Sequence, residues 1–312
     1  MIMVEFQGGL GNQMFQYAFY MTLKTRYPSV EIKADLDNYK MSKYHWGFEI
    51  SKIFNINLDI ATNWECIKAG KKNYLFSHKG FIKKILNKIF LFILFPIISR
   101  CIKTKFIYIN ESYNDFDFQP ELFNLDIKND YYLSGFWFNE LYFIDIKDKL
   151  FLDFQFSKSL YDHSIIRDIM NCESVSIHIR RGDFVGTDFD ILDMDYYKGA
   201  IEYISNKINV PFFYIFSDDI EYAKKEFDYL KNRCFVSENQ GNNSYKDMLF
   251  MSKCKHNIIS NSSFSLWGAY LNKNEGKIVI VPNCLRTNSK GDIINGKWIN
   301  SYLVHNNWIA ID

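Results

Sequence analysis

The sequence has 312 residues, of which 48% are hydrophobic and 18% aromatic, and this is enough apolar material for two well-packed domains. Its formal net charge is +1, so it lacks the basic excess that nucleic-acid binding needs, and we exclude nucleic acid as the main partner. The six cysteines include no C-x-x-C pair, which argues against a zinc or redox site and predicts reduced thiols in a reducing compartment.

We expect a cytoplasmic protein, because the first residues run into a glycine pair without the basic leader of a secretory signal. The longest apolar run, residues 89–98, is shorter than the roughly 20 residues of a membrane-spanning helix. Basic residues flank this run over residues 79–105. Two interpretations stay open: an amphipathic helix in peripheral contact with the inner face of the membrane, or a helical insertion that covers the core.

The first half of the chain begins like an α/β domain. Residues 2–6 have the pattern of an apolar strand, residues 8–11 form a glycine turn, and residues 12–23 show helical spacing. Further strands are expected at residues 30–34 and 131–138. We predict that this first domain covers residues 1–165.

The second half, residues 166–312, alternates strands and helices at the spacing of βαβ units. Helices are expected at residues 157–173, 196–208, 220–227, 245–253 and 265–271. Strands are expected at residues 174–179, 212–216, 234–236, 256–260 and 277–281. This order predicts a parallel, doubly wound sheet.

Polar clusters follow four of the expected strands, at residues 8–13, 178–183, 217–219 and 260–263. The carboxyl ends of parallel strands meet at one edge of a sheet, where ligands bind, so these clusters could open onto one cleft. Adjacent arginines at the end of a strand favour an anionic partner, and the planar guanidinium of Arg180 suits phosphate oxygens. A solvated loop with a structural Arg180–Asp183 pair is the alternative.

The other clusters also allow two interpretations each. The glycine loop is a ligand loop or a tight turn, and the serine cluster is a phosphate site or an ordinary helix cap. Asp218 could accept hydrogen bonds from a ribose, bind a metal or cap the next helix. Two D-x-D pairs, at residues 188–190 and 193–195, follow no apolar strand, and we predict no metal site there.

The chain resembles the α-1,2-fucosyltransferases of bacteria and animals over nearly its whole length. The segments that carry the resemblance stand in the family's order: Gly8-Gly9-Leu10-Gly11-Asn12-Gln13, Gly135-Phe136-Trp137-Phe138, His178-Ile179-Arg180-Arg181-Gly182-Asp183, Phe216-Ser217-Asp218-Asp219 and Ser260-Asn261-Ser262-Ser263-Phe264-Ser265. The resemblance implies an α/β fold of GT-B type, with two Rossmann-like domains facing each other across a cleft. It implies that the first domain mainly holds the acceptor and that the second binds GDP-fucose. It implies an inverting transfer of L-fucose from GDP-fucose, without a metal or other cofactor.

The resemblance also implies roles for individual residues. Arg180 would hold the diphosphate and Asn12 would reach the bond between sugar and phosphate. Asp188 is our candidate for the general base. The remaining residues expected around GDP-fucose are Gly11, His178, Asp183, Asp218, Asp247, Ser262, Ser263 and Phe264, with Asp247 on the guanine edge.

The implied acceptor is a terminal galactose of an oligosaccharide or a lipid-linked glycan. Two rival functions remain at this point. One is a fucosyltransferase of another linkage, since the arginine loop is shared among relatives. The other is a non-catalytic protein that binds a nucleotide sugar or a glycan.

Overall fold

The computed structural model of the chain describes residues 1–41, 46–71, 85–86, 89–90, 93, 106–111, 117–284, 286–287, 293–294 and 307–311. The chain divides into two compact units, Met1–Asp153 and Phe154–Asp312. This division precedes the expected one at residue 165, because Phe154 packs edge-on against Trp267, with ring centroids 5.2 Å apart, and Phe156 stacks on Tyr245. Most of the expected insertion at residues 79–105 lies outside the described residues.

The first unit contains a parallel sheet whose described strands are ordered β2-β1-β4-β3. Its strands are β1 (Ile2–Glu5), β2 (Ile32–Asp35), β3 (Phe106–Asn110) and β4 (Asp130–Ser134), and its helices are α1 (Leu10–Arg26), α2 (Asp37–Met41), α3 (Ile50–Phe54), α4 (Asn63–Lys68), α7 (Lys147–Asp153) and the 3-10 helices Pro120–Phe123, Glu140–Tyr142 and Ile144–Ile146. The expected strand at 131–138 ends at Ser134, because the backbone turns at Trp137, where φ is +60°.

Two helices of the first unit bury apolar residues against the sheet or its neighbouring turns. Helix α1 is buried on nearly all sides, and its Phe19 stacks on Trp137 with ring centroids 4.3 Å apart. Helix α4 begins with a capping box between Thr62 and Glu65, and it packs Cys66 against Met3 and Tyr132 of the sheet.

The second unit contains a parallel sheet of six described strands in the order β12-β9-β8-β5-β6-β7. Its strands are β5 (Ser174–Ile179), β6 (Phe212–Ser217), β7 (Arg233–Val236), β8 (His256–Ile258), β9 (Val279–Pro282) and β12 (Ile309–Ile311), with a separate antiparallel pair β10 (Arg286–Thr287) and β11 (Ile293–Ile294). Its helices are α8 (Ser164–Met170), α9 (Met194–Ser205), α10 (Ile220–Glu226), α11 (Tyr245–Lys253), α12 (Ser263–Tyr270) and the 3-10 helices Lys158–Asp162 and Gly241–Asn243.

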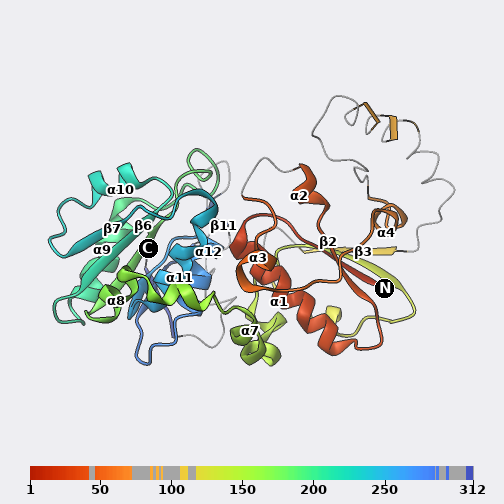
Figure 1. Cartoon of the computed structure of the whole chain (residues 1–312), viewed down its shortest axis with the longest axis horizontal. Coiled ribbons are helices and arrows are strands. Elements are labelled where there is room, and N and C mark those ends of the chain that lie inside the picture. The colour runs from red at the N-terminus through yellow and green to blue at the C-terminus, as the bar shows by residue number, and fades with distance from the viewer. Residues whose placement is uncertain are drawn as a thin grey trace. The chain divides into compact units, whose positions relative to one another are not determined.

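Helices cover both faces of this second sheet (Figure 1). Residues Val175 and Ile177 of β5 pack in one cluster with α9 and α10. The alternate residue Ser176 points to the other face, where it accepts a hydrogen bond from Asn257 Nδ2, which also bonds the carbonyl of Met251 in α11. The expected doubly wound parallel sheet is therefore confirmed.

The predicted α/β fold with two Rossmann-like domains, of GT-B type, is confirmed. Each unit has its own parallel sheet with helices packed on it. Among the helices of the described residues, none combines the length and the apolar character that crossing a bilayer requires.

Candidate functional site

The order of the strands in the second unit creates a switch point between β5 and β8. From β5 the chain proceeds to β6 and β7 on one side, and then crosses to β8 and β9 on the other. In such sheets the crevice outside the carboxyl ends at the switch point is the place where ligands bind. The arginine loop follows β5 and the serine cluster follows β8, so both expected clusters lie at this edge.

Arg180 is the first residue after β5, and its guanidinium is fixed by two carboxylates. Its Nε and Nη2 donate to Asp183 Oδ1 over 2.9 and 2.7 Å, and its Nη1 contacts Asp218 Oδ2 over 3.0 Å. These contacts use three of the five guanidinium N–H donors, which leaves one on each terminal nitrogen. The side chain is 25% exposed, so the oriented fork can reach an anion.

Asp218 organises the rest of the loop. Its Oδ1 accepts a hydrogen bond of 2.9 Å from the Arg181 backbone N–H. The Arg181 guanidinium stacks on Tyr222 at 3.7 Å from the ring centroid and contacts Asp219, which caps α10. Asp218 thus serves the arginine loop, and Asp219 is the helix cap. A small pocket is lined by Arg180, Arg181, Tyr222 and Asn261, among other residues.

His178 is buried beside the start of α12. Its Nδ1 lies 2.9 Å from Ser260 Oγ, and its ring centroid lies 5.7 Å from that of Phe264. Burial lowers the pKa of His178 to about 4, with the Arg180 charge acting in the same direction and Asp218 opposing it. The imidazole is therefore neutral at ordinary pH, and it can hold position through hydrogen bonds rather than through charge.

The serine cluster caps helix α12. Ser262 Oγ accepts a hydrogen bond of 3.3 Å from Phe264 N, which is the ordinary cap that the sequence allowed, and Ser263 is the first helical residue. The helix has no acidic residue in its first turn. Its N-terminal amides thus give the switch point a partial positive charge.

Asp247 lies in the first turn of α11 and is almost fully buried. Its Oδ1 accepts a hydrogen bond of 2.7 Å from Nδ2 of the buried Asn239. Burial raises the pKa of Asp247 to about 8, although Asn239 pulls it down. An acid held in this way is a candidate for ligand binding. Asn239 was not expected from the sequence, since an isolated asparagine in a loop carries no signal.

Asp188 is exposed in the turn that follows the arginine loop. The neighbouring acids of the two D-x-D pairs have structural partners. Asp190 accepts a hydrogen bond from Gly186 N, and Asp193 caps α9 by accepting from Asp195 N and Tyr196 N. Asp190 and Asp193 therefore stabilise a turn and a helix end.

The first unit has a switch point of its own, between β1 and β4. The glycine loop follows β1, and Gly8 adopts a φ of +79°. A Cβ at Gly8 would lie 2.3 Å from Asn12 Nδ2, so glycine is required both by conformation and by space. Asn12 is half-buried in the first turn of α1, and Gly11 is buried beside it. Gly9 precedes this helix and offers no side chain to cap its amides.

Two glutamines of α1 tie the glycine loop to neighbouring segments, and the sequence predicted no role for either. The Gln13 amide nitrogen donates to the carbonyls of Gly8 and Gly47 over 3.1 and 2.9 Å, and its amide oxygen accepts from the backbone of Glu49 and Ile50 over 2.9 and 3.1 Å. Gln16 accepts from Gln7 N and donates to the carbonyl of Gly135, each over 3.0 Å. Glu111 then accepts from the backbone of Phe136 and Trp137 over 2.6 and 2.8 Å. The family-like segment after β4 is therefore held against the loop after β1 by buried polar side chains.

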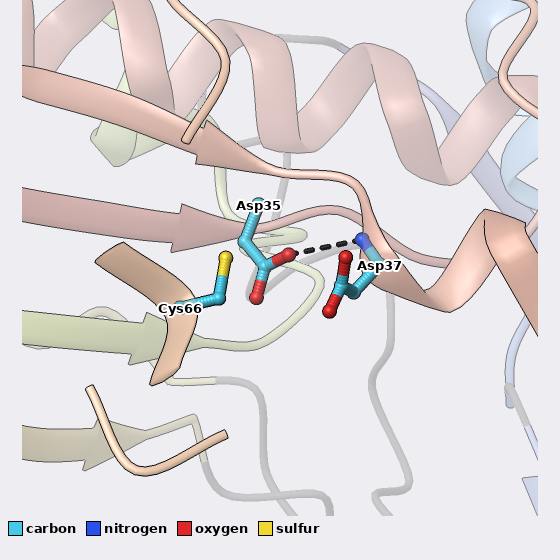
Figure 2. Close-up of side chains that lie close together, drawn as sticks. All are labelled: Asp35, Asp37 and Cys66. Atoms are coloured by element: carbon cyan, nitrogen blue, oxygen red, sulfur yellow. Dashed lines mark hydrogen bonds between the residues drawn. The ribbon is translucent and has the colours of Figure 1, made fainter. Parts of the chain in front are cut away.

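Asp35, Asp37 and Cys66 form a group close enough to share a metal ion within the described part of the chain, as Figure 2 shows. Their existing partners argue against that use. Asp35 accepts from Tyr132 Oη over 2.7 Å and from Asp37 N over 2.9 Å, and Asp37 pairs with Lys40 over 2.5 Å. Burial raises the pKa of the Cys66 thiol, with the two carboxylates acting in the same direction, so the thiolate ligand is disfavoured.

Comparison with known proteins gives one matching family and several relatives. The model of glycosyl transferase family 11 matches residues 1–302. An α-1,2-colitosyltransferase of Escherichia coli is 35% identical over 297 residues, covering 90% of this chain and 91% of that protein. The O-antigen biosynthesis glycosyltransferase WbnK of Escherichia coli is 32% identical over 311 residues, covering 94% and 98%. A galactoside α-(1,2)-fucosyltransferase 1 of Saimiri boliviensis boliviensis is 24% identical over 158 residues, covering 45% and 42%.

Proposed function

Since the chain belongs to glycosyl transferase family 11, we propose that it transfers L-fucose from GDP-β-L-fucose to the 2-hydroxyl of a terminal galactose. The observation that carries this proposal is the arginine fork at the switch point of the second unit. Arg180 is oriented by Asp183 and Asp218 and retains two N–H donors for a diphosphate.

The charges that develop during fucose transfer explain why an oriented guanidinium is useful here. When the bond between C1 of fucose and the phosphate oxygen breaks, positive charge develops on the sugar and negative charge on the leaving diphosphate. A guanidinium that is already oriented stabilises the negative charge without reorganising, and one such donor contributes about 10²–10³ in rate. Attack by the acceptor hydroxyl from the opposite face inverts the anomeric centre. No step of this scheme requires a metal ion.

The acceptor is proposed to be a galactose-terminated oligosaccharide of bacterial surface glycans, either free or lipid-linked. One relative with 32% identity carries O-antigen biosynthesis in its name, which supports this class of acceptor. Peripheral contact with a membrane would bring the enzyme to a lipid-linked acceptor.

The similarity to a colitosyltransferase supports a second candidate donor, a colitose donor. The relative with 35% identity is named for α-1,2-transfer of colitose, so the α-1,2 linkage and the diphosphate site could serve a colitose donor instead. The two donors share the leaving group that Arg180 would stabilise. They differ in the sugar, and a direct comparison of GDP-fucose with GDP-colitose separates them.

The test is an assay of both donors with a panel of galactosides, followed by NMR of the product linkage. We expect an α-1,2-fucosyl product, formed also in excess chelator. Arg180→Ala should lower kcat/KM by at least about 10²-fold. Arg233→Ala is the matched control, because Arg233 is 24% exposed and pairs with Asp228, yet lies away from the arginine loop.

Several outcomes would refute the proposal. Products with only α-1,6 linkage would identify a fucosyltransferase of another kind. Binding of GDP without turnover of any donor would identify a non-catalytic binding protein. Unchanged turnover in Arg180→Ala would remove the assigned role of the guanidinium.

A further inference from the structure

The ring of Tyr222 supports the guanidinium of Arg181. The central carbon of that guanidinium lies 3.7 Å from the ring centroid, which is direct contact, whereas Arg180 lies 5.7 Å from the ring of Phe184. Tyr222 belongs to the first turn of α10 and packs against the hydrophobic core of the second unit. Its hydroxyl makes no hydrogen bond with the described residues, so the face of the ring is the part of Tyr222 that is used.

Arg181 is oriented, yet most of its donors remain available. Its backbone N–H donates to Asp218 Oδ1 over 2.9 Å, and its Nε makes a long contact of 3.4 Å with Asp219 Oδ2. The two terminal nitrogens carry four N–H donors, and these make no hydrogen bond with the residues that the structure describes. The side chain is 28% exposed. The guanidinium can therefore receive a ligand without first leaving another partner.

These donors belong to a pocket that lies wholly within the second unit. Arg180, Arg181, Tyr222 and Asn261 are among the residues that line it, and it lies at the carboxyl end of β5, beside the switch point of the sheet. The pocket thus brings together two guanidinium groups from adjacent residues of the arginine loop. Such a pair suits a ligand with two linked phosphates better than a ligand with one.

A ring is a better support than a carboxylate for a cation that must bind an anion. Asp183 and Asp218 orient Arg180, but their negative charges oppose the approach of a diphosphate. The face of an aromatic ring attracts a cation through its quadrupole and brings no net charge. Tyr222 can therefore fix the plane of Arg181 and leave more of its positive charge for the ligand.

We propose that Tyr222 is a positioning residue of the donor site, which acts by holding Arg181 as a second guanidinium toward the diphosphate of the nucleotide sugar. This inference rests on the proposed function and deepens it. Tyr222 itself does not touch the reacting atoms. It fixes Arg181 before the donor arrives, so that little side-chain freedom is lost when the donor binds.

The experiment measures the Kd for GDP by calorimetric titration of the whole protein. Tyr222→Leu removes the ring and keeps an apolar side chain against the core. We expect the Kd to rise about 3- to 30-fold, the range that corresponds to the loss of a cation–π contact, and the KM for the donor to rise with it. Tyr222→Phe restores the ring and should restore the affinity to within about twofold of the unaltered protein.

A double-mutant cycle tests whether Tyr222 acts through Arg181. In the background of Arg181→Ala, the change Tyr222→Leu should alter the Kd by less than about twofold, because the contact is already lost. If Tyr222→Leu instead costs the same factor in both backgrounds, Tyr222 supports the fold independently of Arg181, and the inference is overturned.

Arg181→Lys approaches the same contact from its other side, and it serves where Tyr222→Leu does not fold. Lysine keeps the charge but lacks the planar fork that lies on the ring. GDP affinity should again fall by at least about threefold, and an unchanged affinity would contradict the inference. Tyr161→Leu is the matched control, because Lys253 Nζ lies 4.7 Å from the centroid of that ring in the same unit, outside the arginine loop.

The outcomes separate this inference from the proposed function. If the unaltered protein neither binds GDP nor turns over a donor, the proposed function fails, and the role of Tyr222 fails with it. If the unaltered protein transfers fucose and Tyr222→Leu binds GDP within about twofold of it, only the inference fails. Binding of GDP without transfer would refute the proposed function, while the affinities of the Tyr222 variants would still decide the role of the ring.

Discussion

The substitution Gly182→Ala tests how the arginine fork is held. A Cβ at residue 182 would lie 2.8 Å from Asp218 Oδ2 and 3.3 Å from Asp218 Cγ. The same Oδ2 contacts Arg180 Nη1 over 3.0 Å. Ordinary van der Waals contact begins at about 3.4 Å, so Asp218 must retreat by several tenths of an ångström, and its contact with Arg180 lengthens toward the roughly 3.5 Å limit of a hydrogen bond.

The expected loss follows from the kind of bond involved. A hydrogen bond between charged groups contributes about 1.5–3 kcal/mol, and the Arg180 contact to Asp183 stays in place. We therefore expect the Kd for GDP to rise at least about tenfold, with a similar fall in kcat/KM. The melting temperature should fall by a few degrees at most, because the contact is weakened rather than removed and residue 182 is exposed.

Calorimetric titration with GDP measures the affinity, and fucose transfer measures the rate. Gly199→Ala is the control, since a Cβ there would lie 3.6 Å from Ile311 Cγ2, an ordinary contact. If Gly182→Ala binds GDP within twofold of the unaltered protein, Asp218 does not orient Arg180 for the diphosphate.

Two further predictions concern buried polar side chains. Asp247 keeps its proton to about pH 8 in the folded protein but loses it near pH 4 when unfolded, so the free energy of unfolding should fall by several kcal/mol as pH rises from 4 to 8. Denaturant titrations should show this slope weakened in Asp247→Asn, and an unchanged slope would contradict the raised pKa. Gln13→Ala removes four hydrogen bonds and should lower the free energy of unfolding by about 2–4 kcal/mol; a loss below about 1 kcal/mol in the same titrations would show that the amide is dispensable.

The sequence predicted the elements of the second half well, because their signals are local. Residues 174–179 alternate in the period of a strand, and the structure has a strand at the same residues. A helix cap was one of the roles allowed for the acids after the strand at 212–216, and Asp219 caps α10, since a cap is a short-range pattern. The strand at 106–110 was missed, since Phe-Ile-Tyr-Ile-Asn follows a basic segment that carries no clear period. The family and its arginine loop were also readable, because the motif segments stand in order along the chain.

Other features of the site depend on residues far apart in the sequence, and only the tertiary structure decided them. Asp218 reaches Arg180 across 38 residues of chain and Arg181 across 37, because β5 and β6 are neighbours in the sheet. The buried Glu49 also belongs to no local motif. Its isolation becomes visible only when Gln13, 36 residues earlier, is seen to bind its backbone, while no described side chain reaches its carboxyl. Local patterns fix strands, helices and caps, since these depend on neighbours in sequence. Whether a buried charge has a partner depends on the packing of distant segments, so no local pattern can show it.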